Sequence, residues 1–375
     1  MNKRILILYT SIGLGHKYIA MNIGYYLEQA GYEVKYHDVL KLQSGIMVSV
    51  GEWFHSLINR RFPFVWRWLY LSKIFSASTR WLRVPLAGSN CENVKQVIEE
   101  FHPDMVIATQ TSASAPMAYL KRRGLYKGKF VIAFSDYHFH PYWEYKEADL
   151  YLTNIEEQKN ALVKLGTDPK KISQIGITLK PQEQVDAQSV KQKLGLTGKI
   201  IYLMSSGSLG IGFPESLLIQ FAEELTRTKQ DVQLVVVCGK NEKMKNRLSV
   251  IVEQNKLNMT VLGFYEPMEE LYSITEVFLT KPGGLTTAEA LRDNVKLLTT
   301  HFLPGQEELN YKFLSLRGLI HPIPNPMTAE NLVKVAAELE SKKIEVENSN
   351  SIEITQKNSE GKALIKSIEN LFHGV

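Results

Sequence analysis

The sequence has little cysteine and no long apolar run. Its 375 residues include two cysteines, Cys91 and Cys238, which are too few for a disulfide framework and suggest a reducing compartment. No uninterrupted apolar run reaches the roughly 18 residues that a membrane-spanning helix needs. The basic N-terminus and apolar residues 5–9 superficially resemble a signal peptide, but Gly13 and His16 follow closely and no small-x-small cleavage site appears. We therefore expect a cytoplasmic protein.

Charge and composition are not extreme either. Lysine and arginine total 44 against 39 acidic residues, which gives a net charge of +5. This is far from a histone-like excess, so the position of the charge matters more than its sum. The hydrophobic share of 44% and the charged share of 22% exclude disorder, collagen and coiled coil. The length predicts two domains of about 150–200 residues each.

Short apolar runs alternate with helical patterns, which is typical of βαβ units in parallel sheets covered by helices. The pattern pauses at Gly176–Ala187, a stretch rich in Gly, Pro, Gln and Lys that we interpret as a linker. We predict an α/β fold with Rossmann-like domains at 1–180 and 181–345, and a polar tail with a last helix at 346–375. The predicted strands are residues 4–9, 33–37, 105–108, 130–134, 150–152, 200–204, 233–237, 260–262, 277–279 and 296–299, and the predicted helices include 18–30, 92–101, 156–165, 214–226, 287–292, 329–339 and 359–372.

A glycine turn, Ser11-Ile12-Gly13-Leu14-Gly15-His16, follows the first predicted strand. A dinucleotide fingerprint would need a third glycine where Tyr18 stands, so the turn indicates NAD binding only weakly. His16 occupies the carboxyl end of a strand, where open α/β sheets bind ligands. The alternative is a histidine that only caps the helix or the turn.

Two more glycine turns occur in the second half. Ser205–Gly212 exposes backbone N–H groups and adds the hydroxyls of Ser206 and Ser208, which suits a phosphate, although a plain strand-to-helix turn is the alternative. Thr280–Leu291 places two glycines before a helix start, which favours a diphosphate without necessarily needing a metal. Glu289, one turn into that helix, could accept two ribose hydroxyls or merely complement the helix dipole.

A fourth loop, Leu303–Asn310, enters another helix. Gln306, Glu307 and Asn310 offer mixed donors and acceptors suited to sugar hydroxyls.

These motifs together resemble the GT-B glycosyltransferases of family 28. The matching patterns are Gly-x-Gly-His after the first strand, Lys-Pro-Gly-Gly-Leu-Thr-x-x-Glu-Ala and Pro-Gly-Gln-Glu-x-x-Asn. The chain is most similar to the branch of monogalactosyldiacylglycerol synthases and processive diacylglycerol glucosyltransferases. Further matches are Ser135–Trp143, Gly176–Pro181 and Val236–Asn241; the departures are Ser135, where the family usually has Thr, and the serine-rich 205–212 loop.

The resemblance implies two Rossmann-like domains facing a cleft. Because a single closing domain would end before the last predicted helix, we also expect this C-terminal helix to cross back to the N-terminal domain. The C-terminal domain would bind a UDP-sugar, with no metal or other cofactor. Glu289 would hold the ribose, Phe264 would lie by the uracil, and Ser208 would assist with phosphate. The diphosphate would be held by Gly284, Leu285 and Thr286, and the sugar by Gln306 and Glu307, with Asn310 also on the donor side.

The N-terminal domain would then bind the acceptor and supply the general base. His16 and Asp136 are the candidates, and His16 is favoured because its ordinary pKa suits a base near neutral pH. Asp136 would need a raised pKa or a role in orienting the histidine. Gly15, His140 and Trp143 would belong to the acceptor side.

A basic aromatic segment interrupts the αβ pattern at residues 44–88. It holds six basic residues against one acid, so it alone carries +5, and it contains four of the five tryptophans. Tryptophan and arginine favour the bilayer interface, so we expect a segment that lies on anionic membrane lipids. Core packing is one alternative, and nucleic-acid binding, which nothing else in the chain supports, is another. The residues expected at the membrane are Trp53, Trp66, Trp68, Trp81, Arg60, Arg61 and Arg67.

The resulting prediction is inverting transfer of a hexose from UDP-glucose or UDP-galactose to the hydroxyl of diacylglycerol, by a peripheral protein on the cytosolic membrane face. Two other reactions stay open: N-acetylglucosamine transfer to a polyprenyl-linked cell-wall precursor and epimerisation of a UDP-sugar. A non-catalytic lipid- or nucleotide-binding module is a further alternative. The choice of hexose, processivity to longer glycolipids and the oligomeric state are left open.

Overall fold

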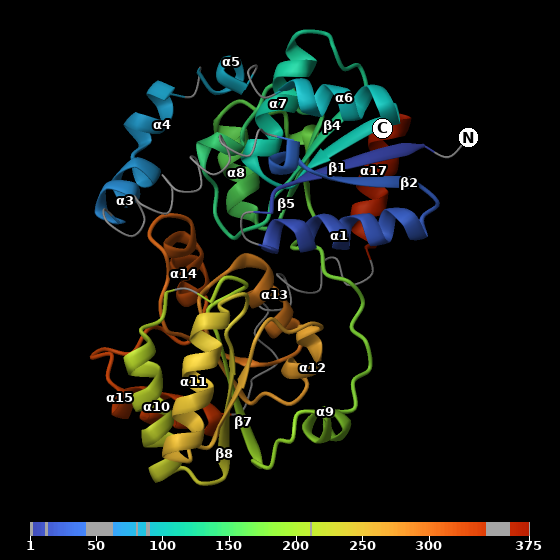
Figure 1. The fold of residues 1–375 in the computed structure, drawn as a ribbon. Coiled ribbons are helices and arrows are strands. Elements are labelled where there is room, and N and C mark those ends of the chain that lie inside the picture. The colour runs from blue at the N-terminus through green and yellow to red at the C-terminus, as the bar shows by residue number, and fades with distance from the viewer. Residues whose placement is uncertain are drawn as a thin grey trace. The chain divides into compact units, whose positions relative to one another are not determined.

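The computed structural model describes residues 3–11, 14–42, 63–79, 82–87, 91–210, 212–342 and 361–374. The chain forms two compact units. Unit 1 comprises Met1–Pro181, Pro304–Leu309 and Glu353–Val375; unit 2 comprises Gln182–Leu303 and Asn310–Ile352. Each unit contains one parallel sheet with helices packed on it, so the predicted α/β fold is confirmed (Figure 1).

Unit 1 is built on a six-stranded sheet of order β2-β1-β3-β4-β5-β6 with every pair parallel. Helices cover both faces of such a sheet, so its inner strands β1, β3, β4 and β5 are largely apolar, whereas the edge strands β2 and β6 are more polar. Ile5–Leu8 of β1, for example, are fully buried. The strands are β1 (Arg4–Tyr9), β2 (Glu33–Asp38), β3 (Met105–Ala108), β4 (Lys129–Ala133), β5 (Leu150–Thr153) and β6 (Ile172–Gln174). The main helices are α1 (Leu14–Gln29), α6 (Cys91–Phe101), α7 (Thr111–Arg122) and α8 (Glu156–Lys164), with 3-10 turns η1 (Val39–Leu42), η4 (Pro141–Trp143) and η5 (Pro169–Lys171).

The last helix, α17 (Lys362–His373), belongs to unit 1. It packs beside α1, as Figure 1 shows. The Phe372 ring stacks on Tyr32 with centroids 6.0 Å apart, and the Lys3 ammonium lies 3.9 Å from the Phe372 ring centre. The predicted return of the C-terminal helix to the N-terminal domain is therefore confirmed.

Between η1 and α6, the described residues form three short helices in place of the αβ pattern. They are α3 (Pro63–Leu71), α4 (Lys73–Thr79) and α5 (Arg83–Ala87). They occupy part of the predicted membrane segment; its remaining residues lie outside the described ranges. Among the described residues, no helix has the length and apolar character needed to cross a bilayer.

Unit 2 has a five-stranded parallel sheet of order β11-β10-β7-β8-β9. Its core is a cluster of buried apolar side chains contributed mainly by the strands, α10 and α15. The strands are β7 (Ile200–Ser205), β8 (Val232–Val237), β9 (Met259–Leu262), β10 (Val277–Thr280) and β11 (Lys296–Thr299). The helices are α9 (Ala187–Lys193), α10 (Glu215–Thr228), α11 (Glu242–Asn255), α12 (Met268–Tyr272), α13 (Gly284–Arg292), α14 (Gln306–Leu316), whose first turn lies in unit 1, and α15 (Ala329–Ser341).

Candidate active site

Asp136 is the centre of a hydrogen-bonded group in unit 1. It lies three residues beyond β4 and is 6% exposed. Its main-chain oxygen accepts the side-chain amides of Asn154 at 2.9 Å and Gln158 at 2.7 Å. Its carboxylate oxygen Oδ2 accepts the Ser135 hydroxyl at 3.0 Å and the Gln306 amide at 2.6 Å. Both the backbone and the carboxylate of Asp136 are thus fixed in place.

His16 lies in the first turn of α1, just after β1. Its Nδ1 is 3.1 Å from the carbonyl oxygen of Thr109. A carbonyl oxygen can only accept, so Nδ1 carries the hydrogen and the neutral ring has its lone pair on Nε2. Burial lowers the pKa of His16, and the negative charge of Asp136 partly offsets that effect. The imidazole is therefore a neutral base near physiological pH.

His138 and His140, which lie in the Ser135–Trp143 motif together with Asp136, contact helix α3. The Nδ1 atom of His140 accepts the backbone N–H of Tyr142 at 3.2 Å, so its Nε2–H donates to the Tyr70 carbonyl at 2.9 Å. The Tyr70 hydroxyl lies 2.9 Å from Nε2 of His138. Both ring nitrogens of His140, which we expected on the acceptor side, make structural contacts: Nδ1 caps η4 and Nε2 contacts α3.

Trp143 and Gly15 have contrasting environments. The Trp143 ring is 5% exposed and stacks on Phe134 with centroids 4.8 Å apart. It is a core residue of unit 1, because burial on this scale removes it from any lipid surface. Gly15 is exposed in α1, and a Cβ placed there would meet nothing within 4 Å.

Helix α3 has two different faces. Phe64 and Trp68 are 83% and 65% exposed, with Val65 beside them. Arg67 points elsewhere, because it makes two 2.7 Å hydrogen bonds to the carboxylate of Glu308. Of the other expected membrane residues, Trp53, Arg60, Arg61 and Trp81 lie outside the described residues; Trp66 is in α3, but its side chain is not described.

In unit 2, the turn after β7 packs closely on the turn after β8. A Cβ on Gly210 would lie 2.0 Å from the carbonyl oxygen of Cys238, so only glycine fits. The backbone N–H of Lys240 donates to the Ser208 carbonyl at 2.9 Å. Lys281 lies over the same turn, with Cε 2.9 Å from the place of a Gly207 Cβ. This ammonium group, which the sequence patterns did not single out, adds a positive charge to the candidate phosphate loop.

The start of α13 has the geometry of an anion site. Gly283 is the N-cap, and the first helical hydrogen bond runs from the Thr287 N–H to the Gly283 carbonyl at 3.0 Å. The N–H groups of Gly284, Leu285 and Thr286 therefore have no acceptor within the helix, and the helix dipole favours negative charge there. These are the three residues expected to bind the diphosphate.

Glu289 lies one turn further along α13. Its carboxylate accepts the Tyr272 hydroxyl at 3.3 Å. Burial and the nearby charge of Glu269 raise the pKa of Glu289 to about 8, against the smaller effects of Arg292 and Tyr272. The side chain is therefore mostly protonated at neutral pH.

The remaining donor-side candidates fall into two groups. Phe264 is 42% exposed, and the Lys240 ammonium lies 5.9 Å from its ring centre, so the ring is accessible for stacking. Glu307 is partly buried in the first turn of α14. Asn310 is fully buried and donates its amide to the Pro282 carbonyl at 3.1 Å, so it positions the Lys-Pro-Gly-Gly turn in this structure.

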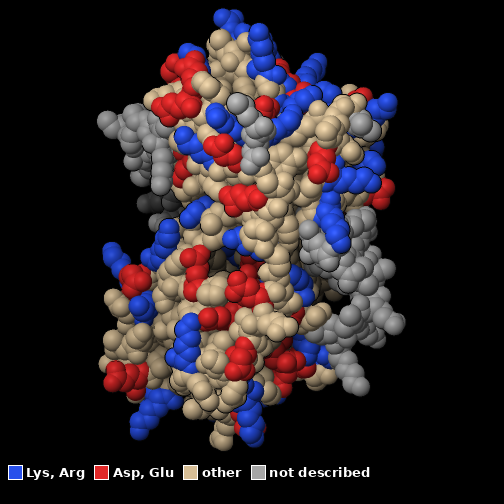
Figure 2. Space-filling view, turned by 90° about the vertical axis from the view of Figure 1, so that its right-hand side faces the viewer, with Lys and Arg blue, Asp and Glu red and all other residues tan. Residues whose placement is uncertain are grey.

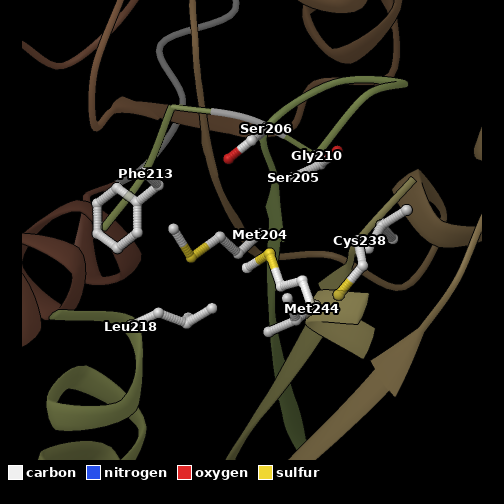
Figure 3. Close-up of a pocket in the computed structure, with 10 residues that line it drawn as sticks. Met204, Ser205, Ser206, Gly210, Phe213, Leu218, Cys238 and Met244 are labelled. Atoms are coloured by element: carbon white, nitrogen blue, oxygen red, sulfur yellow. The ribbon is translucent and has the colours of Figure 1, made fainter. Parts of the chain in front are cut away.

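A small cavity lies beneath the 205–210 turn (Figure 3). Its volume of about 10 Å³ suits a single water molecule and excludes a nucleotide. Its walls include Met204, Phe213, Cys238 and Met244. The void is therefore a packing gap beneath the loop and not the donor site.

Surface charge is mixed on the face shown in Figure 2. Figure 2 shows Lys and Arg side chains interspersed with Asp and Glu over the face it presents. In the part of the chain that the structure describes, no group of three or more His, Cys, Asp or Glu residues has the arrangement of a metal site. The expectation that neither metal nor cofactor is required stays a prediction.

The two units, each with a parallel sheet and covering helices, define the GT-B class of fold. A solved sugar transferase from Siraitia grosvenorii in complex with UDP has a TM-score of 0.64 at 12% identity, over 99% of both chains. The S. aureus MnaA–UDP co-structure has a TM-score of 0.62 at 14% identity, over 100% of this chain and 98% of that one. At these identities the likeness shows the fold alone.

Sequence comparison defines the family within that class. The family described as monogalactosyldiacylglycerol (MGDG) synthase matches residues 16–179, and the glycosyltransferase family 28 C-terminal domain matches residues 206–365. A Bacillus subtilis (strain 168) protein, processive diacylglycerol beta-glucosyltransferase, is 29% identical over 84% of this chain and 82% of its own length. The chain belongs to glycosyltransferase family 28, in the branch of MGDG synthases and processive diacylglycerol glucosyltransferases, as its motifs predicted.

Proposed function

We propose that the protein transfers a hexose from a UDP-sugar to the hydroxyl group of diacylglycerol, with inversion at the anomeric carbon. The observation that carries this proposal is the arrangement around Asp136. A neutral histidine base, His16, lies in the electrostatic reach of a fixed carboxylate, and that carboxylate accepts a hydrogen bond from Gln306 of the loop expected to hold the sugar. Base, orienting acid and sugar loop therefore belong to one group of residues.

The geometry favours His16 over Asp136 as the general base. The carboxylate of Asp136 already accepts two hydrogen bonds, whereas the tautomer of His16 leaves a lone pair on Nε2. In the proposed step, Nε2 takes the proton of the lipid hydroxyl while its oxygen attacks the anomeric carbon and the bond to UDP breaks. Asp136 stabilises the imidazolium that forms.

Unit 2 would hold the donor. The N–H groups of Gly284, Leu285 and Thr286 would bind the diphosphate. Ser208 of the 205–210 turn and Lys281, which lies over that turn, would assist. Glu289 would accept the ribose hydroxyls, and Phe264 would lie by the uracil. These donors and one ammonium group would offset the charge of departing UDP, so we propose that no metal or other cofactor is needed.

The names of relatives support the finer details. The Bacillus subtilis relative is named for a β-glucosyl product. Since the sugar of UDP-glucose is α-linked, a β product requires inversion, which a single displacement provides. We propose UDP-glucose or UDP-galactose as the donor, with the relative's name favouring glucose.

We also propose that the protein works as a peripheral protein on the cytosolic face of the cell membrane. Phe64, Val65 and Trp68 present an exposed apolar surface on α3. The 44–88 segment around it carries the net charge of +5, which suits anionic lipids. Nucleic acid is not a proposed partner.

The test is incubation of the full chain with vesicles containing diacylglycerol and one UDP-sugar at a time, followed by lipid mass analysis. A hexosyl-diacylglycerol from UDP-glucose or UDP-galactose supports the proposal, and a series of longer products would show processivity. Transfer of N-acetylglucosamine to a polyprenyl-linked lipid, or conversion of one UDP-sugar into its epimer without lipid, would overturn it. Nucleotide or lipid binding with no product would support the non-catalytic alternative instead.

A further inference from the structure

Helix α3 lies between the expected membrane surface and the expected sugar loop. Helical geometry places Phe64 and Trp68, four residues apart, on one face, with Val65 at its side. Arg67 and Tyr70, three residues apart, share another face and make the contacts of α3 with the Pro304–Leu309 segment and the Asp136 motif. One face of α3 is therefore exposed toward the expected membrane surface. The other face contacts the Pro304–Leu309 segment and the Ser135–Trp143 motif that contains Asp136.

The contact of Arg67 with Glu308 is a bidentate ion pair. Both guanidinium–carboxylate hydrogen bonds measure 2.7 Å, and Glu308 is 4% exposed. A bidentate pair fixes orientation as well as distance, and a buried carboxylate depends on such a pair more than an exposed one does. Glu308 directly follows Glu307 and lies two residues from Gln306. Fixing Glu308 therefore fixes the two side chains expected to hold the donor sugar.

Tyr70 makes the second contact with this segment. Its ring lies against Gly305, where an added Cβ would be 3.0 Å from the ring; Gly305 has a φ of +93°, which favours glycine. The Tyr70 hydroxyl lies 2.9 Å from His138, two residues beyond Asp136. Tyr70 thus touches the sugar loop on one side and the catalytic motif on the other.

We infer that Arg67 and Tyr70 are positioning residues for the donor sugar, and that seating α3 on an anionic bilayer tightens the binding of UDP-sugar through them. The inference rests on the proposed function, because it takes the Pro304–Leu309 segment as the sugar loop. The occupant of the outer face of α3 is a lipid surface, since exposed apolar rings and a strongly cationic segment are complementary to one. Membrane contact and donor binding are then coupled, and the coupling is reciprocal.

The experiment measures dissociation constants of UDP, UDP-glucose and UDP-galactose for the full chain, with and without phosphatidylglycerol-containing vesicles that lack diacylglycerol. For the wild type we expect vesicles to tighten binding of the preferred UDP-sugar by about fivefold or more and to change UDP binding much less, since UDP has no sugar for the loop to hold. Arg67→Ala should lose most of this gain in UDP-sugar affinity and retain UDP affinity.

Matched variants separate positioning from folding. Arg227 makes a comparable bidentate pair with Glu224 on the surface of unit 2, so Arg227→Ala should leave the vesicle effect intact. Arg67→Lys keeps the positive charge but loses the bidentate contact of the guanidinium, so it should lose part of the vesicle-dependent gain in UDP-sugar affinity. It replaces Arg67→Ala if that variant fails to fold. Arg67→Glu combined with Glu308→Arg should recover part of the effect. Tyr70→Phe should retain the contact with Gly305, whereas Tyr70→Ala should resemble Arg67→Ala.

The outer face is tested separately. Phe64→Ser with Trp68→Ser should abolish the vesicle effect while vesicle-free UDP-sugar affinity is unchanged; Leu125→Ser, also a highly exposed apolar residue of unit 1, should do neither. UDP-sugar binding that is the same in Arg67→Ala and wild type, or an equal loss of UDP and UDP-sugar binding, would overturn the inference alone. A wild-type protein that binds neither UDP-sugar would overturn the proposed function and the inference with it.

Discussion

The two compact units repeat one αβ architecture, but they offer different chemistry where their strands end. In unit 1 the proposed functional groups are side chains, His16 after β1 and Asp136 after β4. In unit 2 the groups proposed to bind phosphate at the start of α13 are backbone N–H groups, and the first ionisable side chain of that helix is Glu289, a turn further on. A phosphate is recognised by charge and by N–H geometry, whereas proton transfer needs a group that titrates near neutral pH.

The difference indicates a division of function in the proposed transferase: unit 1 supplies the groups for proton transfer, and unit 2 supplies the groups for phosphate binding. Removing the proposed base or its orienting acid in unit 1 should damage turnover, whereas removing a group of unit 2 that is expected to bind phosphate or ribose should damage UDP affinity. Substitutions in each unit test this division, and the one with the largest expected effect is at His16.

His16→Ala should reduce kcat by about 100-fold to 10,000-fold, the usual contribution of a general base. UDP affinity should change little, because we propose that the donor phosphates bind in unit 2. Steady-state kinetics measure turnover, and calorimetric titration with UDP measures its affinity. His373→Ala, which changes an exposed histidine at the end of α17, is the control and should alter neither. A variant with wild-type turnover would remove His16 from the mechanism.

Glu289→Gln should weaken UDP binding by about 10-fold to 100-fold, since the loss of charge-assisted hydrogen bonds costs about 1.5–3 kcal/mol. In a single-turnover experiment at saturating UDP-sugar, the rate should fall much less. A loss confined to turnover, with UDP affinity intact, would reverse the division between the units.

Gly284→Pro should weaken UDP binding by about tenfold, because it deletes one N–H donor from the anion site. The first position of a helix tolerates proline, and Gly283 already has the extended conformation (φ −73°, ψ 139°) that a following proline requires. Gly284→Ala keeps the N–H and is the matched control. Equal affinities for the two variants would show that this N–H group does not contact the ligand.

UDP binding should depend on pH through Glu289. The free side chain has a pKa of about 8, and hydroxyl donors prefer its charged form, so binding releases a proton. Affinity should rise with pH by up to about tenfold per unit below pH 8 and level off above it. Glu289→Gln should abolish this slope, and calorimetry in buffers of different ionisation enthalpy should detect the released proton only in the wild type.

The same pKa predicts a stability difference. An unfolded glutamic acid titrates near pH 4.3, so between that pH and about 8 the folded state binds more protons and wild-type stability declines as pH rises. Glu289→Gln should therefore melt a few degrees higher than wild type at pH 8 and no higher at pH 4. A melting temperature lowered at pH 8 would show that the carboxylate is structural.

The smallest expected effect concerns Asp136. Its charge raises the pKa of His16, so Asp136→Asn should shift the acid limb of the kcat/KM profile to lower pH. Turnover should fall less than in His16→Ala. If the acid limb disappears in Asp136→Asn, the carboxylate and not the imidazole is the base.

Much of the fold was predictable because buried parallel strands are continuous apolar runs. Arg4–Tyr9, Met105–Ala108 and Lys296–Thr299 have the predicted bounds. Strand β4 is shifted by one residue at both ends, and each of the other predicted strands differs by one residue at one end. Strand β6 was missed because Ser173 and Gln174 interrupt its apolar pattern. Helices α1 and α13 begin four and three residues earlier than predicted, since glycines at a turn also fit the first turn of a helix.

The candidate site was predictable in part. Local motifs indicated His16, Asp136 and the start of α13, because each is a short stretch that follows a strand. The pairing of Arg67 with Glu308, 241 positions apart, has no local signal. Nor does the position of Lys281 over Gly207. Burial of Trp143 and Asn310 depends on tertiary packing, which residue type alone does not determine.

The most direct test of the central claim is the lipid product made by wild type and by His16→Ala under identical conditions. Diacylglycerol vesicles, UDP-glucose or UDP-galactose and the full chain are incubated, and the lipids are analysed by mass. We expect hexosyl-diacylglycerol from the wild type and a yield at least about 100-fold lower from His16→Ala, with equal UDP affinity in both. A wild type that forms no hexosyl-diacylglycerol would disprove the proposed reaction, and a His16→Ala variant that forms it at the wild-type rate would disprove the role of His16 as base.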